Sequence, residues 1–132
     1  MKILYCGPNN GTSRSRKNGL IKMNHDVINF ELEKNIFTNF KLFQYLEQKS
    51  LNSLNLKIVN RRLLNEVKKY NPDLVWVDKG TYLYKETLEK IKKKNIVIIH
   101  HNTDDIESNK HQFSNYIDSL DLYDAHFTCN KF

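Results

Sequence analysis

Short apolar runs alternate along this chain with longer stretches in which apolar residues recur every three or four positions. Runs of about five apolar residues, bounded by turn residues, predict buried β-strands. The predicted strands are Lys2–Cys6, Asp26–Phe30, Leu74–Val77, Ile96–His100 and Ala125–Cys129. Turn residues mark the ends of these runs, and the densest group is Gly7-Pro-Asn-Asn-Gly11 after the first strand.

The intervening stretches have helical periodicity. Leu56–Tyr70 is the clearest, because its apolar residues are spaced by three and four. Thr12 or Ser13 is expected to cap the first helix, and Asn24 to end it in a left-handed conformation. The other predicted helices run from Ser13 to about Met23, and over Phe37–Gln48, Leu83–Lys94 and Ser108–Leu120.

Strand, helix and strand within about thirty residues form a βαβ unit, which predicts parallel strands with a right-handed crossover. The pattern therefore predicts a single α/β domain with a three-layer Rossmann-like architecture. Two helices join the second and third strands, so the simplest sheet order is the flavodoxin-like 2-1-3-4-5. The ligand crevice of such a sheet lies beyond the carboxyl ends of the strands, at the point where the strand order reverses.

Polar residues follow the apolar strands at this predicted crevice. The loop after the first strand opens a helix, whose free N–H groups and partial positive charge favour an anion. This loop matches neither a dinucleotide-binding nor a P-loop pattern. A tight structural turn with solvated arginines is the alternative interpretation. The candidate binding residues in this region are Gly11, Thr12, Ser13 and Arg16.

The segment from His100 to Asp105 is the second candidate. Neighbouring strand residues point to opposite faces, so His100 and His101 are not expected to serve one site, and no metal site is predicted. We expect His101 and Asp104 to act as catalytic groups at the crevice, as a base or by contacting a reacting hydroxyl. Helix capping is the alternative role for one of the two aspartates that end the segment. Further candidate binding residues are Lys79, Gly80, Asn102, Asp105 and Asn130.

Composition excludes several classes of protein. The formal charge is +6, but the lysines are spread along predicted helices and Arg is scarce, so nucleic-acid binding is not expected. No apolar run is long enough for a membrane span, and the chain begins directly with a strand instead of a signal peptide. Cys6 and Cys129 lack metal-binding spacing, which favours free core thiols and a cytoplasmic protein.

Several motifs, taken in order, resemble the N-terminal domain of a GT-B glycosyltransferase of the spore-maturation type. They are Lys2–Gly7, Gly11–Ser13 with Arg16, Asn24–Val27, Asn71–Gly80, His101–Asp105 and Tyr123–Asn130. Asn24 stands where that family usually has Gly. The resemblance implies that residues 1–132 form the acceptor-binding half of a metal-independent, hexosyltransferase-like enzyme. It also implies a sugar or glycan acceptor, a nucleotide-sugar donor held by an absent C-terminal domain, no cofactor, and inactivity of this half alone.

Two other classes of function stay open. The chain is alternatively a stand-alone flavodoxin-like or receiver-like binding or regulatory module, or a degenerate domain used for assembly. Receivers carry an acidic pair after the first strand and a phosphorylatable Asp after the third. Here Cys6-Gly7-Pro8 follows the first strand, although Asp78 occupies the second position. The chain ends directly after the fifth strand, so we also expect an uncovered apolar strip there that favours self-association.

Overall fold

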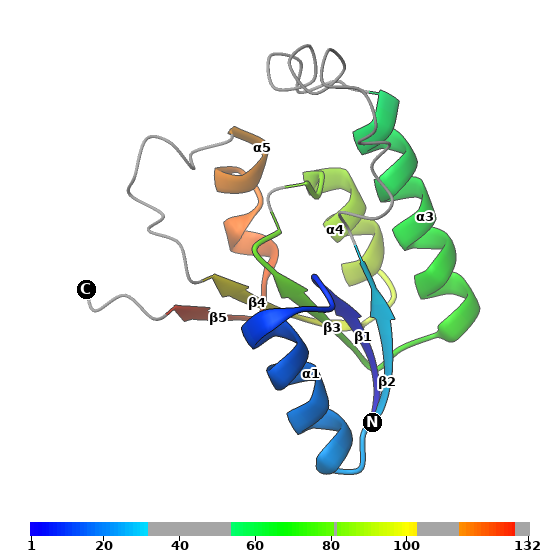
Figure 1. The fold of residues 1–132 in the computed structure, drawn as a ribbon. Coiled ribbons are helices and arrows are strands. Elements are labelled where there is room, and N and C mark those ends of the chain that lie inside the picture. The colour runs from blue at the N-terminus through cyan, green and yellow to red at the C-terminus, as the bar shows by residue number, and fades with distance from the viewer. Residues whose placement is uncertain (32–53, 81, 103–113, 129–132) are drawn as a thin grey trace.

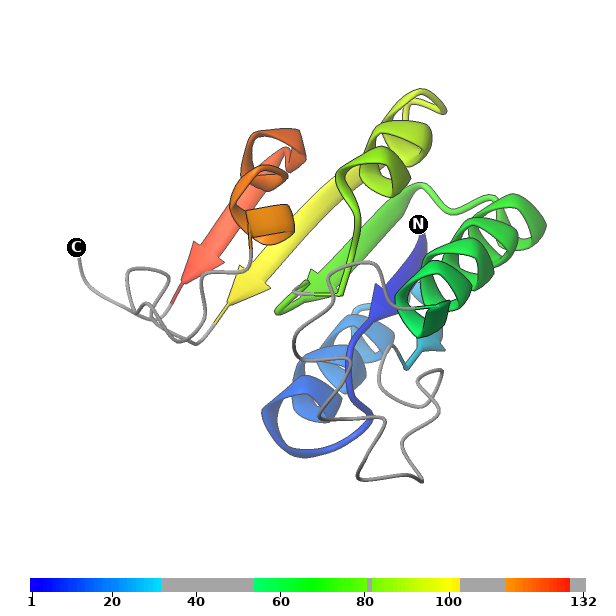
Figure 2. The ribbon, with the colours of Figure 1, turned by 90° about the horizontal axis from the view of Figure 1, so that it is seen from above.

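The computed structural model describes residues 1–31, 54–80, 82–102 and 114–128. Five parallel strands form one sheet in the order β2-β1-β3-β4-β5, and Figure 2 shows their arrowheads pointing the same way. The strands are β1 (Lys2–Cys6), β2 (Asp26–Phe30), β3 (Leu74–Asp78), β4 (Val97–Asn102) and β5 (Ala125–Thr128). The helices are α1 (Gly11–Lys22), α3 (Leu54–Tyr70), α4 (Lys85–Lys92), α5 (Ser114–Ile117) and the 3-10 helix η2 (Leu120–Leu122).

The helices cover the two faces of the sheet unequally. Helices α3, α4 and α5 lie on one face, and α1 lies on the other (Figure 1). The main core fills the first of these interfaces, where α3 contributes Val59, Leu63 and Val67 and α4 contributes Leu88 and Ile91. Each of these side chains is at most 1% exposed. The spacing of three and four that predicted α3 is thus the spacing of its buried face.

Strand alternation sends every second side chain to the face of α1. Leu4 and Cys6 of β1 point into the main core, whereas Tyr5 between them contacts α1 through Ser13. The parallel register carries the same alternation across the sheet, since Tyr5 pairs with Trp76 of β3, and Trp76 pairs with Ile99 of β4. One row of side chains on the α1 face therefore crosses from the centre of the sheet towards its β5 edge.

The predicted fold class, single parallel sheet and strand order are confirmed. The first two strands match the prediction residue for residue, and β3 is longer than predicted by one residue, Asp78. Asn24 has a φ of 60°, as expected of a left-handed helix end. The predicted N-cap is wrong: α1 starts at Gly11 after Asn10, and Ser13 is instead buried inside the first turn, where it contacts Tyr5.

Other expectations agree in part or lie outside the described residues. Helix α4 is shorter than the predicted Leu83–Lys94, because the chain turns before it, where Leu83 N–H bonds to the carbonyl of Gly80. The predicted helix Phe37–Gln48 and residue Cys129 lie outside the described residues. Cys6 is a buried free thiol, as expected. None of the described helices is long and apolar enough to cross a bilayer.

Candidate functional site

Asp78 lies at the centre of a cluster of polar and aromatic side chains near the carboxyl ends of the strands. It is the last residue of β3, lies between β1 and β4, and is 3% exposed. Gly7 makes this position possible, because a Cβ at residue 7 would lie 2.8 Å from Cβ of Asp78 and 3.0 Å from Oγ of Ser13. The first loop therefore passes directly over the carboxylate. A buried carboxylate at this place needs partners to offset its lost hydration.

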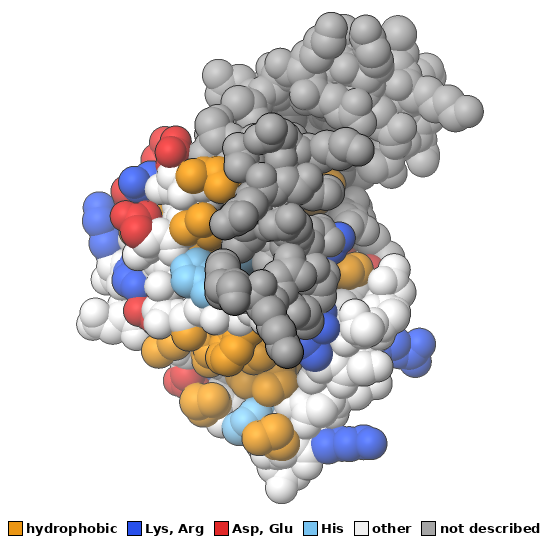
Figure 3. Space-filling view, turned by 90° about the vertical axis from the view of Figure 1, so that its left-hand side faces the viewer, with side chains coloured by type: hydrophobic (Ala, Val, Ile, Leu, Met, Phe, Trp, Pro, Cys, Tyr) orange, Lys and Arg blue, Asp and Glu red, His pale blue; other side chains and the backbone are white. Residues whose placement is uncertain are grey.

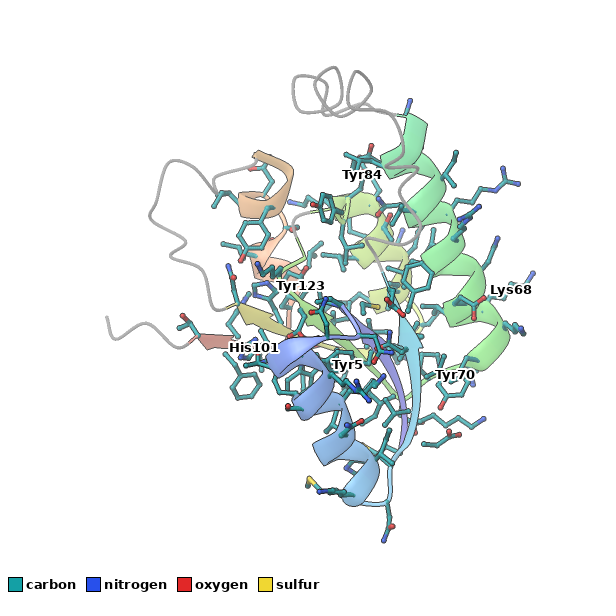
Figure 4. All side chains as sticks on the ribbon, viewed as in Figure 1. Tyr5, Lys68, Tyr70, Tyr84, His101 and Tyr123 are labelled. Carbon is teal, nitrogen blue, oxygen red and sulfur yellow. The ribbon has the colours of Figure 1, made fainter. Side chains whose placement is uncertain are left out.

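One carboxylate oxygen has two strong donors. The Tyr5 hydroxyl donates to Oδ2 of Asp78 over 2.5 Å, and the guanidinium of Arg16 on α1 reaches the same oxygen at 2.9 Å. The Tyr5 hydroxyl also lies 3.1 Å from Oγ of Ser13. Figure 4 shows Tyr5 beside α1, on the side of the sheet away from α4. The cluster thus ties the first helix to the two central strands through a charge-assisted contact.

The second carboxylate oxygen faces β4 and an aromatic neighbour. Trp76 Nε1 donates to Oδ1 of Asp78 over 3.4 Å, and Nδ1 of His101 lies 3.3 Å from the same atom. His101 Nδ1 makes no aligned hydrogen bond in this arrangement. The register explains the contact with β4, since Asp78 and His101 are direct neighbours across the two strands. We call Tyr5, Ser13, Arg16, Trp76, Asp78 and His101 the Asp78 cluster.

The partners keep the cluster in a defined charge state. Burial by itself raises the pKa of Asp78, but hydrogen bonds from Ser13, Tyr5 and Arg16 outweigh it and lower the pKa below the ordinary value. Burial and the hydrogen bond to Asp78 raise the pKa of Tyr5 to about 12. The pKa of His101 is lowered, first by burial and then by the charge of Arg16. At neutral pH the cluster is an ion pair of Asp78 and Arg16 beside a neutral imidazole.

His100 belongs to a separate cluster on the opposite face, as the strand alternation predicts. Its Nε2 lies 2.9 Å from the carbonyl oxygen of Lys79, and its Nδ1 lies 3.2 Å from Nδ1 of His126 on β5. The Tyr116 hydroxyl approaches the same Nε2 at 3.3 Å and accepts a hydrogen bond from Asn102 at 2.9 Å. Burial lowers the pKa of His100 to about 4, so this histidine is neutral at physiological pH.

The structure brings together some of the residues expected at the crevice. Ser13, Arg16 and His101 meet at Asp78. Lys79 and Gly80 follow directly and have φ angles of 69° and 74°, so the chain turns sharply at the strand end. Asn102 instead points to the Tyr116 side and is buried there. Gly11 and Thr12 start α1 and are exposed.

Asp104, Asp105 and Asn130 lie outside the described residues, so their expected roles stay predictions. The same holds for ligand binding by Gly11, Thr12, Lys79 and the neighbouring candidates, and for a catalytic role of His101. Three members of the Asp78 cluster were absent from the expected site: Tyr5, Trp76 and Asp78 itself. The signal in the sequence was the alternation within β3, which places Trp76 and Asp78 on one face. That Tyr5 of β1 shares this face follows from the register between the two strands.

The geometry argues against a bound divalent cation at the cluster. Such a cation is held by several oxygen ligands, usually including more than one carboxylate. Asp78 instead has the positive guanidinium of Arg16 at 2.9 Å, a charge that repels a cation. Among the described residues, no three His, Cys, Asp or Glu side chains lie close enough to share a metal ion.

Comparison with known proteins gives a likeness of fold. No protein-family model matches the sequence, and no curated protein is significantly similar to it. Among solved structures, the chain is similar to the BeF3-activated N-terminal receiver domain of RstA from Klebsiella pneumoniae, with a TM-score of 0.55 and 13% sequence identity. The match covers 100% of this chain and 88% of the other. The fold is therefore flavodoxin-like, of the kind that receiver domains have.

This likeness overturns the resemblance to a GT-B glycosyltransferase half. The sugar acceptor and the nucleotide-sugar donor that the resemblance implied are withdrawn with it. The physical reason is that the quoted motifs are short apolar strands followed by turns. Any parallel α/β sheet of this order needs such elements, so they report the architecture and carry no information on glycosyl transfer.

Proposed function

We propose that this chain is a receiver-like regulatory module that acts by binding a partner, without phosphorylation of Asp78. The flavodoxin-like sheet and the position of Asp78 at the end of β3 support the receiver-like class. The single observation that carries the rest is the contact of Arg16 and Tyr5 with one oxygen of Asp78. That oxygen already has a cationic and a neutral donor, so it is a poor nucleophile.

The surroundings of Asp78 support the same conclusion. Phosphoryl transfer to a carboxylate depends on a metal ion or other cations that neutralise the transferred group. The residues after β1 are Gly7 and Pro8 instead of an acidic pair, and the first loop presses on Asp78 through Gly7. The carboxylate is 3% exposed, which leaves little room for an incoming phosphoryl group. In this proposal Asp78 holds α1 against the sheet, and signals arrive through protein contacts.

A phosphorylatable receiver is the second candidate, because an aspartate ends β3 as that function requires. NMR with Mg²⁺ and beryllofluoride, a phosphoryl mimic, separates the two. In ¹H–¹⁵N spectra we expect the amide signals of Asp78, Lys79 and Gly80 to stay in place when Mg²⁺ and then beryllofluoride are added. Shifts that centre on these residues and vanish in Asp78→Asn would show that the carboxylate takes a phosphoryl group.

A further inference from the structure

Side chains on the α1 face of β3, β4 and β5 form an exposed apolar surface. Phe127 is 49% exposed and Val97 is 45% exposed, while Trp76, Ile99 and Ala125 are partly buried. Figure 3, viewed from the β5 side, shows hydrophobic side chains gathered below the centre of this face, with Lys and Arg side chains at their right-hand edge. Among the described helices, α1 alone lies on this side of the sheet (Figure 1). We call Trp76, Val97, Ile99, Ala125 and Phe127 the open face.

The aromatic rings of the open face are near-parallel to each other and to rings of the Asp78 cluster. Trp76 and Phe127 have centroids 6.0 Å apart and ring planes within 2° of each other, and Tyr5 continues the stack at 6.1 Å from Trp76. His101 lies 6.5 Å from Trp76. The near-parallel rings thus form one row from the buried Tyr5 of the Asp78 cluster to the exposed Phe127 on the edge strand. Aromatic residues are enriched at the centres of protein interfaces.

Helix α1 borders the open face along one side. Arg16 of α1 reaches Asp78 on β3, so the flank of α1 that carries Arg16 faces the open face. Residues three and seven positions further on share that flank, and they are Gly19 and Met23. A Cβ built on Gly19 has no atom within 4 Å, and Met23 is 67% exposed. Another backbone therefore has room to approach α1 closely at Gly19, with Met23 beside it.

The open face beside α1 is wide enough for one helix. Adjacent strands lie about 5 Å apart and a helix with its side chains is about 10 Å wide, so one helix spans β3 to β5. An apolar stripe on such a helix would cover Trp76, Ile99 and Phe127, and its flank would pack against Gly19 of α1. Helices packed side by side have axes roughly 8–10 Å apart, so the basic helix α1 lies close enough to a docked helix for their charges to interact.

The positive charge of α1 favours a docked helix that carries acidic residues. The helix carries Arg14, Arg16, Lys17 and Lys22 and no acidic residue, and the chain has a formal charge of +6. Charges on a helix docked beside α1 lie within about one Debye length at physiological salt. Acidic residues on the docked helix are therefore attracted, and basic ones are repelled.

A second copy of this chain fits the open face poorly. Packing two open faces together would bring two basic α1 helices towards each other. The outward side of α1 carries polar and charged residues, among them Arg14, Asn18 and Lys22, so it cannot serve as the apolar stripe.

We propose that the open face beside α1 docks an amphipathic helix of a partner protein, whose apolar stripe is flanked by Asp and Glu. This inference rests on the proposed function, since it names the partner class of the regulatory module. The two can fail separately. Phosphorylation at Asp78 would refute the regulatory mechanism alone, and an open face that binds no helix would refute the docking alone.

Titration with synthetic helices tests the docking, because Trp76 is the single Trp of the chain and reports on its own environment. The probe is a Trp-free peptide of about 18 residues, with Leu at positions i, i+3, i+4 and i+7 and Glu on both flanks. A second peptide carries Lys in place of Glu, and a third has the first composition in scrambled order. We expect the Glu peptide alone to shift Trp76 emission to shorter wavelength, with affinity at least about tenfold above the Lys peptide and falling with added salt.

Variants on the two faces of the sheet provide the matched control. Phe127→Ser and Val97→Ser should each weaken binding of the Glu peptide, Phe127→Ser by about tenfold or more. Ile28 is an exposed residue of β2 that pairs with the core residue Leu4 and so lies on the opposite face. Ile28→Ser should leave the affinity within about twofold. Circular dichroism verifies that all three variants fold.

Equal binding of the Glu and Lys peptides, or no loss in Phe127→Ser, would overturn the proposal. A protein that is dimeric without peptide and becomes monomeric in Phe127→Ser would assign the face to a second copy instead.

Discussion

Asp78 shows how a buried carboxylate at the end of a strand is held by its neighbours. A buried carboxylate is costly to desolvate, and here Tyr5, Ser13 and Arg16 offset that cost. Tyr5 and Arg16 both contact Oδ2 of Asp78, which leaves Oδ1 with the longer contacts to Trp76 and His101. Arg16 itself is 26% exposed, so the pair sits at the boundary between the interior and solvent. The contact fixes the start of α1 relative to β3.

The first prediction concerns this ion pair. Asp78→Asn keeps the shape but removes the charge, so we expect the free energy of unfolding to fall by about 2 kcal/mol at neutral pH. The matched control is Asp124→Asn. Asp124 pairs with Lys92 at 2.7 Å, but the two side chains are 41% and 38% exposed, and water screens them, so this change should cost less than about 1 kcal/mol. Equal losses in urea denaturation would show that Asp78 has no special structural role.

The pH dependence of the same residue follows from its lowered pKa. The unfolded chain takes up a proton near pH 3.8, and folded Asp78 only at lower pH. The stability due to Asp78 is therefore present above about pH 4 and lost as the pH falls below it. In Asp78→Asn the free energy of unfolding should depend less on pH in that window. An unchanged acid slope would mean that the carboxylate is not held ionised by its partners.

Glycines provide a second prediction at this scale. Gly80 has a φ of 74°, and a Cβ there would lie 2.9 Å from the Tyr123 hydroxyl and 3.0 Å from Cγ1 of Val77. Gly80→Ala should therefore lower the free energy of unfolding by at least about 1 kcal/mol. Gly19→Ala in α1 meets no atom and should raise it by about 0.5–1 kcal/mol. Thermal melts of the two variants that shift in the same direction would contradict the assigned backbone geometry.

At the scale of elements, β4 connects two clusters because its side chains alternate. His101 faces Asp78 and α1, whereas His100 faces His126, Tyr116 and the carbonyl of Lys79. The sequence was sufficient to predict this separation, because it follows from the strand period alone. It was insufficient to show which residues of other strands would meet each histidine. Those contacts depend on the register between strands, which is set by tertiary packing.

The start of α1 is a second place where the sequence alone was insufficient. A serine ahead of a helical stretch is a good local capping signal, and Ser13 was expected to cap for that reason. The hydroxyl of Tyr5, eight residues away, instead holds Ser13 inside the helix. A contact between a strand and a helix thus overrode a local preference. Regular positions such as β1 and β2 agreed with the sequence pattern because no such competition exists there.

The contact between β4 and β5 leads to a pH prediction. The pKa of His100 is lowered from 6.5 to about 4, mainly by burial and also by the nearby His126 and His101, although the Lys79 carbonyl and Asp78 act in the opposite direction. The folded protein therefore binds this proton less readily than the unfolded chain does. The stability contributed by neutral His100 is complete above pH 6.5 and is lost as the pH falls towards 4, by about 3 kcal/mol.

Urea denaturation at several pH values between 7.5 and 4 would measure this effect. In His100→Gln this side chain cannot titrate, so the free energy of unfolding should depend less steeply on pH over the same range, with the remaining slope due in part to His101, whose pKa is also lowered. A slope equal to that of the original protein would mean that another group is responsible. This window lies above that of Asp78, so the two contributions can be separated.

For the whole molecule, the fold was predictable because parallel sheets require apolar strands, crossover helices and a defined order. The glycosyltransferase hypothesis was wrong, because the same short motifs serve many unrelated proteins with this sheet, whereas the alternative of a receiver-like module agrees with the fold. The residues that distinguish them here, Tyr5 and Arg16 against Asp78, are spread over β1, α1 and β3. These side chains come together only in the folded protein. The open face and the basic α1 likewise become one surface only after folding.

The most direct test of a phosphorylation-independent module is the intact mass of the protein after incubation with acetyl phosphate and Mg²⁺. We predict an unchanged mass, because Arg16 and Tyr5 both contact Oδ2 of the buried Asp78 and no acidic pair follows β1. A gain of one base-labile phosphoryl group that is absent from Asp78→Asn would contradict this account and assign the chain to the phosphorylated receivers.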